Sequence, residues 1–250
     1  MSNPNETTTT TTTTTTIKEM FRLFQDAPMY FDGRERTLLR GKPHLIASAL
    51  IFPCVFYFYY QAAISNSYAL FVGLLNVIIV WIAHIISGIY HGIEMTLENE
   101  IMMQKLDHVF LAWYITACYY PMSLLLFPLG PPIYVFLIIL HLVLFYIWYN
   151  IWNCNFSVKL HTLLVIVGVP IFYFYMLPYF TTLELRCFVS AILIGFIALL
   201  VQLNEYCPNC FNLEGVFNHF DFYHVFSVAC FSLILLLNYS IVKRCSGEDK

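Results

Sequence analysis

Residues 70–83 read LFVGLLNVIIVWIA, a run in which Asn76 is the only strongly polar side chain. This run belongs to a longer apolar segment, 68–91, and about 20 helical residues are enough to cross the roughly 30 Å hydrocarbon layer of a bilayer. A strand of a membrane barrel would be shorter and would alternate polar with apolar residues, which this run does not do. The segment therefore predicts a transmembrane α-helix.

The same criterion predicts six more membrane-spanning helices. With 60% hydrophobic and only 11% charged residues, the 250-residue chain has too little polar surface for a soluble globule. Its net charge of −3 offers no basic patch, so we expect no nucleic-acid partner. The predicted fold is all-α, a bundle of seven transmembrane helices. The six further spans lie near residues 44–64, 107–127, 131–152, 160–180, 183–203 and 220–242.

The remaining segments are predicted to flank this membrane domain. A run of threonines from Thr7 to Thr16 has too few apolar side chains to form a core, so we expect a disordered tail. The next residues place apolar side chains near helical spacing, which favours an amphipathic helix on the membrane surface or against the bundle. The predicted divisions are a tail at 1–16, a cytoplasmic flank at 17–42, the membrane domain at 43–244 and a C-terminal tail at 245–250.

Basic residues predict the orientation of the bundle. Eight of the twelve Lys and Arg residues fall on the side of the N-terminus, and four fall on the opposite side. Loops that flank membrane spans and are rich in Lys and Arg tend to stay in the cytoplasm. We therefore expect a multi-pass protein with a cytoplasmic N-terminus.

Five polar residues inside the predicted spans suggest a functional site, because ionisable groups at membrane depth are costly. Ser87 and His91 are four residues apart on the second span, and Asp221 and His224 are three apart on the seventh, so each pair shares a helix face. Asp107 begins the predicted third span. All five lie near the cytoplasmic ends of their helices, where we expect them to meet.

Four stretches carry a family resemblance: RTLLRGKPHLIASAL from residue 36, SGIYH from 87, KLDHVFLAWYITACYYP from 105 and VFNHFDFYHVF from 216. In their order and spacing they resemble hemolysin III, a branch of the progestin and adipoQ receptor family, in a wider group that includes alkaline ceramidases. The resemblance implies a polar site made of Ser87, His91, Asp107 and His224. It also implies a zinc ion, with His91 and His224 among its ligands.

The resemblance fails at one expected ligand. Phe220 occupies the place of a histidine, and the nearest histidine, His219, is rotated by about 140° from His224 on a continuous helix. A zinc site normally has at least three protein ligands. His219 could serve from a loop before the helix, Asp221 could supply a carboxylate, or the site could be degenerate. A competing metal site combines Cys207 and Cys210 with the same histidines, at a spacing shorter than is usual.

Two function classes follow. In the first, a zinc-activated water, Asp107 and Ser87 hydrolyse an amide or ester bond in a membrane lipid such as a ceramide. In the second, the same residues form a non-enzymatic receptor or lipid-homeostasis protein with a degenerate metal site. His44 and His141 are expected to have structural or interfacial roles, and the role of His84 is left open.

Overall fold

The computed structural model describes residues 37, 39–126, 131–153, 174–203 and 218–247. Within these ranges the ordered elements are helices, and no strand occurs. In chain order they are α2 (Lys42–Ile46), η1 (Ala47–Ile51), α3 (Phe52–Ala63), α4 (Ser67–Gly92), α5 (Leu97–Ala117), η2 (Met122–Leu126), α6 (Pro131–Asn153), η3 (Phe174–Tyr179), α8 (Thr182–Leu203) and α9 (His219–Ser246).

Five helical segments of the described chain are long and apolar enough to cross a membrane, which agrees with an integral membrane protein. They correspond to the first, second, third, sixth and seventh predicted spans. A further helix, α6, covers the predicted fourth span. The predicted fifth span falls largely outside the described residues, as do the tail at 1–16 and nearly all of the flank. The five segments are Lys42–Ala63, Ser67–Gly92, Leu97–Leu126, Thr182–Val201 and Asp221–Ser246.

The third span begins ten residues earlier than the sequence predicted. Thr96 caps the N-terminus of α5 by accepting a hydrogen bond from the Asn99 N–H, at 3.5 Å. Glu98 and Glu100 lie in the first turn, where carboxylates interact favourably with the helix dipole. Because these charged residues lower the local hydropathy, the hydropathy criterion did not predict the first turns of α5. Asp107 consequently lies almost three turns inside α5 rather than at its start.

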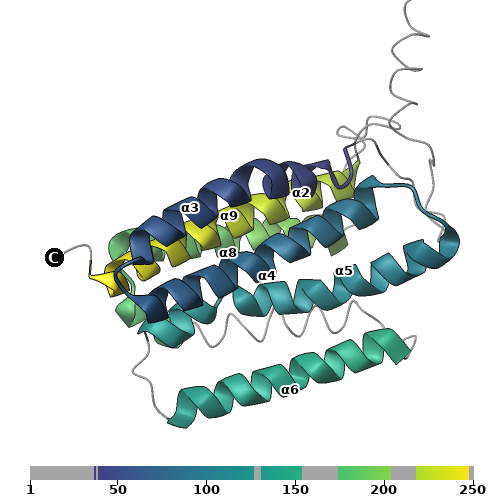
Figure 1. Ribbon diagram of the computed structural model, residues 1–250. Helices are drawn as coiled ribbons and strands as arrows, with labels where there is room; N and C mark the ends of the chain where they lie inside the picture. The colour runs from purple at the N-terminus through teal and green to yellow at the C-terminus, as the bar shows by residue number, and fades with distance from the viewer. Residues whose placement is uncertain (1–36, 38, 127–130, 154–173, 204–217, 248–250) are drawn as a thin grey trace, which may run out of the picture.

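The helices form an elongated bundle with the two ends of the described chain at opposite ends of it (Figure 1). At one end, Thr37 contacts Asp221 in the first turn of α9. At the other, Ser65 donates a hydrogen bond to the Ser246 carbonyl at the end of α9. Helices α3, α4, α8 and α9 lie close together, with α5 beside α4, while α6 lies along the edge of the bundle (Figure 1).

Two glycines let the beginning of α2 pack closely against the end of α4. A Cβ on Gly88 would lie 2.6 Å from a methyl carbon of Leu45. Gly41 has φ 79°, which favours glycine, and a Cβ there would lie 2.6 Å from the Gly92 nitrogen. This close approach brings the first residues of α2 next to the C-terminal turns of α4, where His84 and His91 are located.

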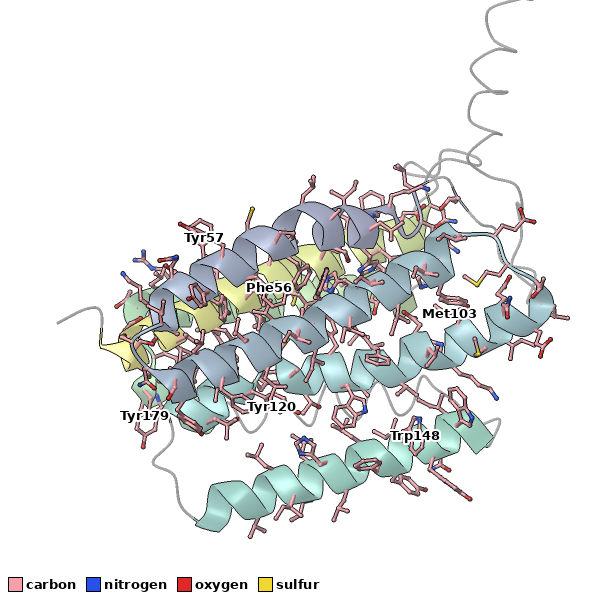
Figure 2. The ribbon with its side chains drawn as sticks, viewed as in Figure 1. Phe56, Tyr57, Met103, Tyr120, Trp148 and Tyr179 are labelled. Carbon is pink, nitrogen blue, oxygen red and sulfur yellow. The ribbon has the colours of Figure 1, made fainter. Side chains whose placement is uncertain are left out.

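Aromatic residues distinguish the inner and outer faces of α3. Phe56 packs edge to face with Trp81 of α4, with ring centroids 5.6 Å apart, whereas Tyr57 points away from the bundle (Figure 2). Tyr59 is buried and donates a 2.7 Å hydrogen bond to the Leu235 carbonyl of α9. The exposed aromatic face is suited to lipid contact.

Candidate functional site

A cavity of about 120 Å³ lies where α2, α4, α5 and α9 meet. Four residues that the sequence singled out line it together: Ser87 and His91 from α4, Asp107 from α5 and His224 from α9. From the sequence we expect five polar residues to meet; four of them line this cavity, and the fifth, Asp221, does not. His44 and His84 line the same cavity, so it contains an unusual number of imidazoles for a membrane protein interior.

His91 lies between the acid and the second histidine of the predicted set. Its Nε2 is 3.8 Å from Asp107 Oδ2, an ion-pair distance that is longer than a hydrogen bond. Its ring centroid is 4.4 Å from that of His224. The side chains of His91 and Asp107 are only 10% and 12% exposed, so bulk water screens this pair weakly. Contacts of this kind commonly shorten when a substrate binds.

Asp221 lies apart from this group. Its Oδ2 accepts hydrogen bonds from Thr37 Oγ1 at 2.6 Å and from the Asn218 N–H at 2.7 Å, and its Oδ1 is 3.6 Å from Arg40 Nε. Asp221 does not line the cavity. Its carboxylate therefore ties the chain before α2 to the first turn of α9, and the predicted role as a metal ligand has no support from these contacts.

His219 is the first residue of α9. It therefore does not lie in the loop before the helix, the location in which the sequence made it a possible metal ligand. The position of its imidazole is not among the side-chain positions that the structure describes. Cys207 and Cys210 are also outside them, and the competing metal site that includes them stays a prediction.

The sequence interpretation underrated His44 and Arg40. His44 is buried, and its Nε2 is 2.9 Å from His224 Nδ1. Arg40 is buried as well, and its Nη2 donates a 2.8 Å hydrogen bond to Asn218 Oδ1. A signal was present, because Thr37, Arg40, His44 and Ser48 recur every three or four residues and so mark one polar face at the start of the first span.

His84 has a local partner within α4. Its Nδ1 is 2.9 Å from the Val80 carbonyl oxygen, and since a carbonyl only accepts, this nitrogen must donate. The ring also contacts His44 and Tyr114 edge to face, with centroids 5.1 and 5.2 Å apart. His84 therefore presents Nε2 as its unprotonated nitrogen when it is neutral.

The cavity residues do not form a ready metal site. Among the residues that the structure describes, no three His, Cys, Asp or Glu side chains are arranged to hold a metal ion. Zinc needs three or four ligand atoms at about 2.0–2.3 Å. His44 Nε2 and His224 Nδ1 lie 2.9 Å apart, a distance typical of a hydrogen bond. The described donor set therefore does not fit the zinc ion that the family resemblance implies.

In comparisons with known proteins, no family model, no curated protein and no solved structure matches the chain.

Proposed function

We propose that this protein is a multi-pass membrane protein of the hemolysin III and adipoQ receptor type that hydrolyses an amide or ester bond of a membrane lipid. The observation that carries the proposal is the shared cavity of Ser87, His91, Asp107 and His224, which come from three helices. A nucleophile-activating base, an acid that pairs with it and hydrogen-bond donors are the groups that acyl hydrolysis requires.

The chemistry can be derived from the residues themselves. His91 takes a proton from a water molecule as the water oxygen attacks the carbonyl carbon of the lipid. Asp107, 3.8 Å from His91 Nε2, stabilises the imidazolium that forms. Collapse of the tetrahedral intermediate breaks the bond to the amine or alcohol, which leaves with the proton that His91 returns. The products are a fatty acid and the free amine or alcohol.

Ser87 is placed to stabilise the negative charge on the former carbonyl oxygen. It lies one helical turn before His91 on the same face of α4 and lines the same cavity. A hydroxyl that donates to the developing oxyanion lowers the barrier to attack. In a variant of this scheme, Ser87 is itself the nucleophile. Trapping an acyl-enzyme on Ser87 would identify that variant.

The substrate class follows from the location of the cavity. Each helix that lines it belongs to a segment long and apolar enough to span a membrane. The lining includes residues of the start of α2, the last turns of α4 and the first turns of α9, which meet at one end of the bundle (Figure 1). A scissile bond close to a lipid headgroup would lie at this depth. We therefore propose N-acyl sphingoid lipids such as ceramides, or acyl esters, as the substrates.

The test is fatty-acid release by the purified protein in vesicles that contain either an N-acyl sphingoid lipid or a fatty-acyl ester. We expect release from one class, and a loss of about 100-fold or more in Asp107→Asn, which retains size but not charge. Glu94→Gln, an exposed change on the loop after α4, is the control and should retain full activity. A folded wild-type protein that releases no fatty acid from either class would contradict the proposal.

The alternative is a non-enzymatic receptor or lipid-homeostasis protein. It is favoured by one observation: several of the polar groups at this end of the bundle bind one another, as in the pairs His44–His224 and Arg40–Asp221. Under this alternative a lipid would bind the cavity without being cleaved. Such a lipid would raise the thermal stability of the wild type and would be recovered intact after incubation.

The zinc ion remains a prediction from the resemblance. Metal analysis of the purified protein tests it, with one zinc per chain as the result that supports it and no zinc in active protein as the result that excludes it.

A further inference from the structure

We propose that His44 fixes the tautomer of His224, so that His224 faces the cavity as a hydrogen-bond donor rather than as a metal ligand. The assignment of the proton follows from the contacts of His44 alone. The use of that donor, which is to stabilise the oxyanion of a lipid carbonyl, rests on the hydrolase proposed above.

The two rings form a buried pair that links the first span to the last. His44 Nε2 and His224 Nδ1 are 2.9 Å apart, and the ring planes meet at 85°, with centroids 5.0 Å apart. Both residues are buried, with 7% and 6% of their surface exposed. The distance and the burial indicate an N–H···N hydrogen bond protected from water.

The direction of this bond depends on the other nitrogen of His44. A neutral imidazole carries one N–H, so either His44 Nε2 donates to His224, or His224 Nδ1 donates to His44. In the second arrangement the proton of His44 would be on Nδ1. That atom is buried and has no hydrogen-bond partner among the described residues. A buried N–H without an acceptor is rarer in proteins than an unfilled acceptor. His44 Nε2 is therefore the donor.

This direction decides what His224 can do. With Nδ1 as the acceptor, the proton of His224 is on Nε2, which is then a donor and has no lone pair for a metal. A zinc-bound His224 would instead coordinate through one nitrogen and donate from the other. His84 has the opposite character, because its Nδ1 donates to the Val80 carbonyl and leaves Nε2 as an acceptor. His224 and His84, two of the imidazoles that line the cavity, are thus of opposite kinds.

The direct test is nitrogen NMR of the full-length protein labelled with ¹⁵N-histidine, because protonated and unprotonated ring nitrogens have well-separated shifts. His84 and His141 are internal references, since each Nδ1 bonds a carbonyl oxygen and must carry the proton. We expect His224 to show a protonated Nε2, and a coupling across the hydrogen bond from His44 Nε2. A protonated Nδ1 on His224, or a metal-bound His224 nitrogen, would overturn the proposal. Single His→Gln variants assign the signals.

A pair of variants tests the consequence in activity. His44→Gln retains an N–H near the position of Nε2, whereas His44→Leu has similar bulk and no donor. We expect kcat for lipid hydrolysis to fall about 10–100-fold in His44→Leu, because the oxyanion donor is no longer positioned, and His44→Gln to restore most of it. His141→Gln and His141→Leu are the matched controls, because His141 lies away from this cavity and bonds Tyr120. Equal losses in both His44 variants would contradict the positioning role.

The two proposals can fail separately. If the wild type hydrolyses neither lipid class while His224 carries its proton on Nε2, the hydrolase proposal fails and the tautomer assignment stands. If the wild type hydrolyses lipid while His224 carries its proton on Nδ1, the assignment fails and the hydrolase proposal stands.

Discussion

Two aspartates that look alike in the sequence have different surroundings. Asp107 faces His91 across the cavity, whereas Asp221 is held by Thr37, Arg40 and the Asn218 N–H. A carboxylate that is held by several donors is a stabilising bridge, while one at ion-pair distance from an imidazole in a cavity can respond to a proton on that ring. Chemistry at this end of the bundle should therefore depend on Asp107, and folding should depend on Asp221.

Asp221→Ala should lower the stability of the protein by about 3–5 kcal/mol, because it removes the counter-charge of an arginine that is itself buried. The measurement is the melting temperature of the detergent-solubilised protein. Glu98→Ala, which removes an exposed carboxylate at the start of α5, is the control and should change stability by no more than about 1 kcal/mol.

The double variant Arg40→Met/Asp221→Ala should recover part of that loss, because no uncompensated charge is left in the interior. A single Asp221→Ala variant as stable as the wild type would contradict the bridging role and reopen the question of a ligand role for this carboxylate.

At the scale of helices, the break after α5 shows how polar side chains can be structural in a membrane. Pro121 has no N–H, so it cannot donate to the carbonyl of Ala117 four residues earlier. Asn76 of α4 donates to that carbonyl instead, at 2.7 Å, and Asn238 of α9 donates to the Cys118 carbonyl at the same distance. Asn76, the polar residue inside the apolar run 70–83, thus replaces a backbone hydrogen bond that Pro121 cannot make in the neighbouring helical segment.

Asn76→Leu should therefore destabilise the protein by about 1–2 kcal/mol, since it leaves a buried carbonyl without its donor. In a Pro121→Ala background the loss should shrink, because the introduced alanine can supply the missing N–H. Asn150→Leu is the control, as the Asn150 amide bonds a carbonyl of its own helix, and its effect should be smaller. Equal effects of Asn76→Leu in both backgrounds, by thermal unfolding, would refute this account.

Hydropathy predicted the spans well where they are uniformly apolar, as in α4, and less well where charge begins a helix, as in α5. Ser87, His91, Asp107 and His224 could be placed together because helical spacing and span order constrain them. The hydrogen-bond and ion-pair partners of those residues could not be predicted from the sequence. The acid that pairs with Arg40 and the His224 nitrogen that faces His44 both depend on how the start of the first span packs against α9. These partners are about 180 positions apart in the chain.

At the scale of the molecule, the two ends of the bundle differ in character. The cavity end contains the histidines and the Arg40–Asp221 pair. At the opposite end, buried Glu184 accepts a 2.9 Å bond from Arg244 near the end of α9. If the long helices cross a membrane, the first and last described residues are on opposite sides of it (Figure 1).

Tags at the two termini should accordingly be accessible from different sides, the N-terminal one from the cytoplasm, as the distribution of Lys and Arg predicts. Protease protection of tagged protein in sealed membrane vesicles measures this, with detergent-opened vesicles as the control. Two tags cleaved from the same side would contradict the topology.

The most direct measurement of the central claim is the rate of fatty-acid release from ceramide- or ester-containing vesicles by wild type, His91→Ala and His141→Ala prepared in parallel. Both histidines lie within helices of the bundle, but only His91 lines the cavity beside Asp107. The account predicts release by the wild type and by His141→Ala, and a fall of about 100-fold or more in His91→Ala. Release that persists in folded His91→Ala would contradict it.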